Sequence, residues 1–219
     1  MFAKLGVIGA GKMGSALIKL FLKRTDADIT VLTRQVKQAS RSRLTFTDNP
    51  GDLGDCQLVV ETVVEDFDTK QKILSSIPDG PIIGSCTSSL SINKLSSSCP
   101  NPNRFLGLHF INPVSRMPLV EVIPSSCTTQ ETLQTAISLV QLLGKEHVIV
   151  PDIPGFLLNR ILLPSILEAQ KLVESGIEPG CVDKVMQLGA GWPIGPMRLG
   201  EMIGRDTLQL IIKNLTHCS

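Results

Sequence analysis

Three glycines near the amino end are spaced as in a loop that binds a phosphate group. Gly9, Gly11 and Gly14 form the pattern G-x-G-x-x-G between a β-branched run and an apolar stripe of helical spacing. In such a loop the first glycine permits a tight turn, the second lets the backbone approach a pyrophosphate, and the third lets helix and strand pack closely. The N–H groups at the helix amino terminus favour an anion. The pattern predicts a dinucleotide site formed by Gly9, Gly11, Lys12, Met13 and Gly14.

The residues after the second expected strand bear on which dinucleotide is bound. An acidic side chain at that position would bond the adenosine ribose hydroxyls. The sequence has Thr33 and Arg34 there instead. A guanidinium can pair with a 2′-phosphate, and Lys37, Arg41 and Arg43 are further candidates for the same contact. Thr33 and Arg34 therefore favour NADP(H), while the alternative is that these cations belong to a solvated loop.

Short β-branched runs alternate with helical patterns as far as residue 150, and these elements must position the glycine loop. This alternation predicts a Rossmann-like α/β fold with a doubly wound, mainly parallel sheet. Thr128 or Thr129 could cap a helix that ends at Gly144. The expected strands are Lys4 to Ile8, Asp28 to Leu32, Gln57 to Val63, Pro81 to Ser85, Arg104 to His109, Leu119 to Ile123 and His147 to Val150.

The pattern changes after the segment 151–155, which contains Pro154 and Gly155. Beyond it only helical stretches occur, around residues 157–175, 181–188 and 196–215. Pro164 is expected to kink the first of these helices or to mark its beginning. We therefore predict an NAD(P)-binding domain over residues 1–152 and a small all-helical carboxyl-terminal domain over residues 153–219.

Composition and charge exclude several classes of protein. The chain has 219 residues, of which 42% are hydrophobic, and its 21 Lys and Arg nearly balance its 20 Asp and Glu. This composition indicates a globular protein with no charge footprint for nucleic acid or for an anionic membrane. Without a long apolar run or a signal-like amino end, a cytoplasmic location is expected. The cysteines are far apart and lack a C-x-x-C pair, which favours reduced thiols and predicts no metal site.

Longer motifs occur further along the chain. They are Glu61 to Asp66 with Lys70, Cys86 to Ile92, Arg104 to Pro113, Leu119 to Ile123, Asp152 to Arg160 and Trp192 to Pro196. Together and in this order they resemble the 3-hydroxyacyl-CoA dehydrogenases, which include the 3-hydroxybutyryl-CoA dehydrogenases. The resemblance implies an NAD(H)-dependent oxidoreductase of fatty acid metabolism. It would transfer a hydride to or from C3 of an acyl-CoA or another acyl thioester.

The resemblance also implies a catalytic pair, His109 and Glu121. Oxidation of a secondary alcohol needs a base to take the hydroxyl proton, and imidazole titrates close to neutral pH. A carboxylate on the other ring nitrogen would fix the tautomer and stabilise the imidazolium. His109 ends one expected strand and Glu121 lies in the next, so the pair can meet at the carboxyl edge of the sheet or across neighbouring strands.

Other residues match the motif with roles of their own. Ser88 resembles the hydroxyl that contacts the substrate oxygen, and Asn159 resembles the amide that orients the substrate from the helical domain. Asn112 resembles a contact on the nicotinamide side. Glu65 and Lys70 resemble residues that line the cofactor. The resemblance therefore implies four catalytic residues and three further cofactor contacts.

The sequence departs from the family pattern at three places. Cys86 stands where the family usually has Asn, and only residues 35–56 replace a helical hairpin that contributes to binding the CoA portion. The chain ends at Ser219, before the further helices of the family pattern, so we expect a compact or truncated member. An exposed apolar surface would then favour association as a homodimer.

Two other interpretations remain open from the sequence alone. The stretch from Ile8 to Lys19, with the short second connection and Arg34, also resembles pyrroline-5-carboxylate reductases. This likeness fades after residue 50. A different class of function is a non-catalytic dinucleotide-binding protein on the same scaffold.

Overall fold

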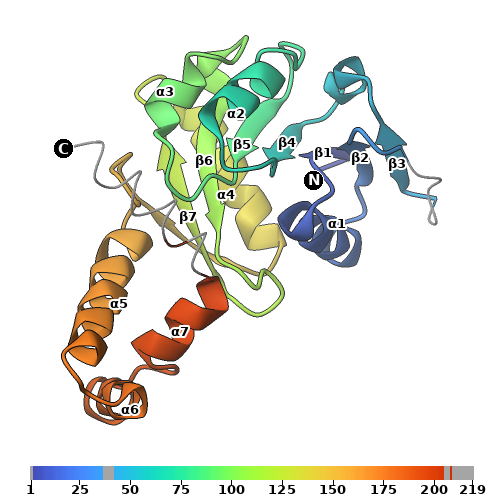
Figure 1. Ribbon diagram of the computed structural model, residues 1–219. Coiled ribbons are helices and arrows are strands. Elements are labelled where there is room, and N and C mark those ends of the chain that lie inside the picture. The colour runs from blue at the N-terminus through green and yellow to red at the C-terminus, as the bar shows by residue number, and fades with distance from the viewer. Residues whose placement is uncertain (1, 37–41, 205–207, 209–219) are drawn as a thin grey trace. The chain divides into compact units, whose positions relative to one another are not determined.

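One eight-stranded sheet forms the centre of the first unit of the chain (Figure 1). The computed structural model describes residues 2–36, 42–204 and 208, and the boundary between its two compact units lies between Asp152 and Ile153. The strands run in the order β3-β2-β1-β4-β5-β6-β7-β8. Their bounds are β1 Lys4–Ile8, β2 Asp28–Leu32, β3 Leu44–Thr47, β4 Leu58–Glu61, β5 Ile82–Ser85, β6 Phe105–Phe110, β7 Leu119–Pro124 and β8 Glu146–Ile149.

Neighbouring strands are parallel except for β6 and β7, which pair antiparallel. The prediction of a Rossmann-like, mainly parallel sheet is therefore confirmed. Strand β3 was not expected from the sequence. It is a four-residue edge strand, Leu44–Thr47, that pairs only with β2, so it carries little of the apolar pattern by which buried strands are recognised.

Helices cover both faces of the sheet (Figure 1). On one face lie α1 (Lys12–Arg24) and α4 (Gln130–Leu142), because the apolar stripes of both helices pack into the same core cluster as β1, β2 and β4. On the other face lie α2 (Phe67–Leu74) and α3 (Ile92–Ser96). Because the helices cover the faces of the sheet, the loops of the site lie at the carboxyl ends of the parallel strands.

Local caps set the ends of these helices. Of the two candidate caps for α4, the structure uses Thr129, whose hydroxyl accepts from the Thr132 N–H. Gly144 follows the last turn with φ +70°, a conformation that favours glycine. Two short 3-10 helices, η1 (Pro50–Leu53) and η2 (Pro102–Arg104), lead into β4 and β6.

The second unit is helical in the part of the chain that the structure describes. It contains α5 (Leu158–Glu174), α6 (Pro179–Ala190) and α7 (Pro196–Ile203). Pro164 lies inside α5 and so does not mark its beginning. The helix expected over residues 196–215 is described only as far as Ile203 and at residue 208. None of the described helices is both long and apolar enough to cross a membrane.

Candidate active site

His109 and Glu121 are brought together by the pairing of β6 with β7. The antiparallel register sets the two residues directly opposite each other, and His109 Nδ1 lies 2.7 Å from Glu121 Oε2. Directly opposite residues on one face of such a pair have side chains within contact distance. Both side chains are buried. Of the two arrangements that the sequence allowed, the pair thus meets across neighbouring strands.

In this geometry one nitrogen of the imidazole ring, Nδ1, is bonded to the Glu121 carboxylate. With the Glu121 carboxylate accepting at Nδ1, the proton of a neutral ring is held on that atom. His109 is the penultimate residue of β6, so the imidazole lies near the end of its strand. The pair can therefore act as an oriented general acid or base.

The glycine loop has the shape that a pyrophosphate requires. Gly9 has φ +95° and its N–H donates to the Leu32 carbonyl, so the chain turns sharply as it leaves β1. A Cβ atom on Gly14 would lie 2.0 Å from the Gly9 carbonyl oxygen, which shows that α1 and the turn are in close contact. A Cβ atom on Gly11 would meet nothing within 4 Å. The space beside Gly11 is therefore open to a ligand.

The amino end of α1 completes this loop. Gly11 is its N-cap residue and offers no side-chain cap for the first N–H groups of the helix. Gly11 and Lys12 are exposed, and Met13 is half-buried. Uncapped N–H groups, an exposed cation and open space fit the pyrophosphate of a dinucleotide.

The end of β2 carries the residues that bear on cofactor choice. Thr33 is half-buried, and its N–H donates to the Thr47 carbonyl of β3. Arg34 follows and is exposed. Arg43 does not lie beside them, because it precedes β3 and so lies near the amino ends of β2 and β3. Its guanidinium donates there to carbonyls at the end of α1 and in the loop that follows. Lys37 and Arg41 lie outside the described residues.

Ser88 lies in a loop that gathers around the carboxylate of Glu65. The N–H groups of Ser88 and Ser89 donate to Glu65 Oε1 at 2.8 and 2.9 Å. The hydroxyls of Thr87 and Ser89 donate to the same oxygen at 2.7 and 2.8 Å. Glu65 thus ties the turn after β4 to the loop after β5.

Lys70 lies beneath this loop in a buried charge network. Its side chain is 1% exposed, and its Nζ is 2.7 Å from Glu61 Oε1 and 3.7 Å from Glu65 Oε2. The Ser85 hydroxyl donates to the other oxygen of Glu61 at 2.6 Å. Glu61 and Ser85 were not among the residues singled out from the sequence. A carboxylate that ends an apolar strand was the available signal, because an unpaired buried charge is costly.

Cys86 follows β5 at the position where the family pattern usually has Asn. Burial of the thiol, and then the nearby Glu61 carboxylate, raise the pKa of Cys86 above its ordinary value. The Cys86 N–H donates to the Glu61 carbonyl at 2.8 Å. Cys86 therefore lies against the buried charge network as a neutral thiol.

Two further predicted residues come from other elements of the fold. Asn112 is exposed, two residues after β6, and precedes Pro113 through a cis peptide bond. Asn159 is buried, but it belongs to α5 of the second unit and so is not one of the side chains that the first unit brings together. Among the described residues, no group of three or more His, Cys, Asp or Glu side chains is arranged to hold a metal ion.

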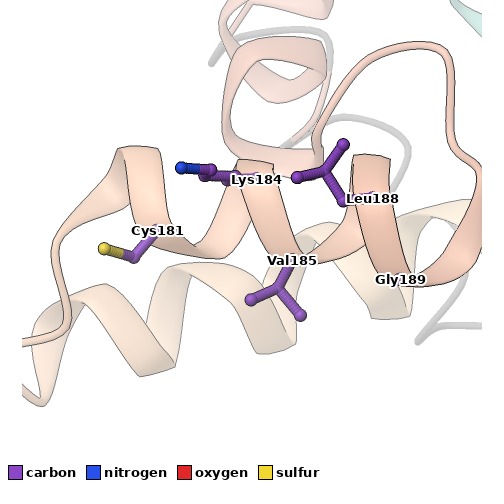
Figure 2. Close-up of a pocket in the computed structure, with 5 residues that line it drawn as sticks. All are labelled: Cys181, Lys184, Val185, Leu188 and Gly189. Carbon is purple, nitrogen blue, oxygen red and sulfur yellow. The ribbon is translucent and has the colours of Figure 1, made fainter.

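An apolar surface is exposed on α6 of the second unit (Figure 2). Val185 and Leu188 are 67% and 77% exposed. Together with Cys181, Lys184 and Gly189 they line a shallow pocket along one helix.

Comparison with known proteins adds the family. The model of the 3-hydroxyacyl-CoA dehydrogenase NAD binding domain matches residues 29–153, and that of the 3-hydroxyacyl-CoA dehydrogenase C-terminal domain matches residues 155–218. The chain is 36% identical over 244 aligned positions to a 3-hydroxybutyryl-CoA dehydrogenase of Bradyrhizobium diazoefficiens, with 97% of this chain and 83% of that protein covered. Since the alignment is longer than this chain, the relative has residues with no counterpart here.

Similarity extends to longer proteins and to a solved structure. A fatty acid oxidation complex subunit alpha of a Psychrobacter species is 42% identical over 76% of this chain, which spans 24% of that subunit's length. The crystal structure of (S)-3-hydroxybutyryl-CoA dehydrogenase PaaH1 from Ralstonia eutropha is 30% identical with a TM-score of 0.89, and 100% of this chain and 88% of that chain are covered. The chain therefore belongs to the 3-hydroxyacyl-CoA dehydrogenase family and is an oxidoreductase with an NAD-binding domain.

Proposed function

We propose that this protein transfers a hydride reversibly between C3 of a 3-hydroxyacyl-CoA and NAD(H), with His109 as the general acid and base. The observation that carries the proposal is the buried pairing of His109 Nδ1 with Glu121 Oε2 in a member of this family. In the oxidation direction, His109 Nε2 takes the proton of the C3 hydroxyl as the hydride leaves the same carbon. When bound, NAD⁺ supplies the acceptor for that hydride.

Glu121 acts through His109 in this proposal. Its carboxylate keeps the Nδ1 proton in place and stabilises the imidazolium that forms when Nε2 is protonated. Ser88 and Asn159 are proposed to position the substrate, Ser88 by a hydroxyl contact with the C3 oxygen.

The glycine loop is proposed to hold the cofactor. Gly9, Gly11 and Gly14 would cradle the pyrophosphate with Lys12 and Met13, because the loop is open at Gly11 and the start of α1 is uncapped. Glu65, Lys70 and Asn112 are proposed to line the cofactor, as the family pattern implies. The burial of Lys70 restricts its part to one made through Glu61 and Glu65.

NAD(H) is the cofactor that the family supports. We further propose that Arg34 adds affinity for NADP(H), because no carboxylate follows β2 and the guanidinium is exposed at its end. Arg34 would pair with a 2′-phosphate, with Thr33 beside it. The protein would then accept both dinucleotides.

The substrate is proposed to be an acyl-CoA with a short acyl chain. Relatives of this chain are named as 3-hydroxybutyryl-CoA dehydrogenases, and others as subunits of a fatty acid oxidation complex. A role in fatty acid metabolism is proposed on the same basis, and a cytoplasmic location is proposed from the sequence alone. The short connection from residue 35 to residue 56 supports fewer contacts to the CoA portion than the family pattern provides.

We also propose that the protein forms a homodimer through the exposed surface of α6. Val185 and Leu188 would be covered by a second copy of the chain, because the burial of apolar side chains as exposed as these is favourable. Light scattering after size exclusion would report a dimer for the native chain. Val185→Asp with Leu188→Asp should give a monomer, whereas a native monomer would contradict the proposal.

Titration with NADH and NADPH, followed by an assay of acetoacetyl-CoA reduction, tests the proposed function. Loss of reduced-nicotinamide absorbance should accompany turnover, and His109→Ala should remove most of it while it leaves the affinity for NADH nearly unchanged. Cofactor binding without turnover on any acyl thioester would instead favour the non-catalytic dinucleotide-binding protein. Equal loss of turnover and of cofactor affinity in His109→Ala would count against the assigned role.

A further inference from the structure

The loop that carries Ser88 is anchored to a single carboxylate oxygen. Glu65 Oε1 accepts from the Thr87 hydroxyl, the Ser88 N–H, the Ser89 N–H and the Ser89 hydroxyl, all within 2.9 Å. Successive backbone N–H groups that converge on one point form an anion-binding concavity. Here the anion is a side chain of the protein itself, from the turn that follows β4.

The far end of the same segment is held by a second carboxylate. Asp152 accepts from the Ser91 hydroxyl and from the N–H groups of Ile92 and Asn93, at 2.8 to 3.0 Å. These bonds fix the amino end of α3. Ser88 therefore lies in a short span with both ends anchored, and the position of its backbone is set on the amino-terminal side by Glu65.

The buried ammonium group of Lys70 balances the charge of Glu65. Lys70 Nζ lies 3.7 Å from Glu65 Oε2 and 2.7 Å from Glu61 Oε1, and the Lys70 and Glu61 side chains are 1% and 0% exposed. A partly buried carboxylate is retained only when it is paired and hydrogen-bonded. Lys70 binds the oxygen that the loop leaves unused, so the two oxygens of Glu65 join the loop to the buried network.

We propose that Glu65 is the positioning residue for Ser88: its carboxylate holds the Thr87–Ser89 loop so that the Ser88 hydroxyl meets the substrate oxygen. This inference rests on the proposed function, in which Ser88 contacts that oxygen. It gives Glu65 a role that acts through Ser88 in addition to any contact with the cofactor. A displacement of about 1 Å at a positioning residue can cost about 10²-fold in rate.

A double-mutant cycle separates this role from a cofactor contact. Glu65→Gln is expected to lower kcat for acetoacetyl-CoA reduction by roughly 10- to 100-fold, because the amide weakens the four bonds and no longer pairs with Lys70. In a Ser88→Ala background the same substitution should lower kcat by less than about 3-fold, because residues that act as one unit are not additive. The Kd for NADH should stay within about 2-fold in Ser88→Ala, and in Glu65→Gln it should rise by clearly less than kcat falls.

The neighbouring Asp66 supplies a matched control. Its carboxylate accepts from the N–H and the hydroxyl of Thr69 at the start of α2, so it anchors a helix and not the Ser88 loop. Asp66→Asn is expected to leave kcat within about 2-fold. Additive losses from Glu65→Gln and Ser88→Ala, or a rise in the Kd for NADH that matches the fall in kcat, would overturn the proposal.

Hydrogen exchange of the apoprotein tests the anchoring without any turnover. Glu65→Gln should speed exchange of the Ser88 and Ser89 amides and leave the strands unchanged, and unchanged exchange at these amides would overturn the proposal. This exchange measurement can be made even if the native chain turns over no acyl thioester. Absence of turnover would refute the proposed function, but not the anchoring of the loop by Glu65. Should Glu65→Gln not fold, Glu65→Asp keeps the charge beside Lys70, draws the oxygen away from the loop, and carries the same comparisons.

Discussion

His109 and Glu121 occupy directly opposite positions in the antiparallel pair of β6 and β7, with Nδ1 of one 2.7 Å from Oε2 of the other. Two adjacent strands supply both members of the pair through their register. The orientation of the imidazole is therefore built into the register of the sheet and needs no loop to maintain it.

Substitutions at this pair should have unequal effects. His109→Asn is expected to lower kcat by about 10²- to 10⁴-fold, the range that a positioned general acid or base contributes. Glu121→Gln should cost less, because the amide can still accept from Nδ1 but no longer offsets the imidazolium charge. Steady-state kinetics with acetoacetyl-CoA and a fluorescence titration with NADH would measure both effects.

One result of this comparison would contradict the role of His109 as the general acid and base. Glu121→Gln removes the charge and keeps the shape, so its affinity for NADH should match that of the native chain. A larger loss of kcat in Glu121→Gln than in His109→Asn would show that the carboxylate, and not the imidazole, carries the chemistry.

Substitutions at two glycines of the nucleotide loop should have different effects, one on the stability of the fold and the other on the affinity for NADH. A Cβ atom on Gly14 would lie 2.0 Å from the backbone oxygen of Gly9, so Gly14→Ala must shift α1 or the turn and should destabilise the fold by at least about 1–3 kcal/mol. A Cβ atom on Gly11 meets no protein atom within 4 Å. Gly11→Ala should therefore fold normally and still bind NADH about tenfold or more weakly, because its methyl group enters the space for the pyrophosphate.

Urea unfolding and NADH titration of the two variants would check this contrast. The Gly11→Ala variant serves as the control for Gly14→Ala, since both add one methyl group to the same loop. Unchanged NADH affinity in a folded Gly11→Ala variant would argue that the pyrophosphate lies elsewhere.

The parts of the fold that follow from local pattern were predictable from the sequence. Alternating strand and helix patterns gave the Rossmann-like sheet, and apolar stripes gave α1 and α4. Strand β3 was missed because a four-residue edge strand has one partner and a weak apolar pattern. The antiparallel direction of β7 was also beyond the pattern, since the residues of a strand do not specify the direction of its neighbour.

The candidate site also has parts that the sequence could predict and parts that it could not. The glycine loop has a local signature, because each glycine answers to a backbone requirement within a few residues. The network of Glu61, Lys70 and Ser85 has no local signature beyond the carboxylate that ends β4. Its members come from β4, α2 and β5 and meet only in the folded sheet. The bonds from Thr87, Ser88 and Ser89 to Glu65 span more than twenty residues. Motif resemblance identified Glu65 but could not show what it holds.

Arg34 should affect one dinucleotide and not the other. Arg34→Ala is expected to weaken NADPH binding by about tenfold, a loss of about 1.4 kcal/mol, because it removes a cation that can pair with the 2′-phosphate. NADH lacks that phosphate, so its affinity should change little. Titration of each dinucleotide at two salt concentrations would measure this, with a steeper salt dependence expected for NADPH.

Arg43→Ala is the matched control for Arg34→Ala. Its guanidinium donates to carbonyls at the end of α1 and in the loop that follows, near the amino ends of β2 and β3, whereas Arg34 follows the carboxyl end of β2. The ratio of NADPH to NADH affinity should stay unchanged in Arg43→Ala, although stability should fall. Equal weakening of both dinucleotides by Arg34→Ala would assign Arg34 to the shared adenosine portion instead.

Because of Cys86, the stability of the fold should depend on pH in the alkaline range. Burial and the Glu61 carboxylate raise its pKa above the ordinary value of 9.0, so the folded chain holds this proton after the unfolded chain has lost it. A group with a raised folded-state pKa stabilises the fold fully below its unfolded pKa and progressively less above it. Stability should therefore fall as the pH rises past about 9, by at most about 1.4 kcal/mol per pH unit from this one group.

Cys86→Ser isolates this contribution, because the hydroxyl is of similar size and does not titrate in this range. The urea midpoint should decline less between about pH 8 and pH 10 in Cys86→Ser than in the native chain, while every other titrating group is shared and cancels in the comparison. Cys127→Ser, a substitution at an exposed thiol, should follow the native chain. An equal decline in Cys86→Ser and the native chain would mean that the thiol is hydrated and that water reaches the space beside Glu61.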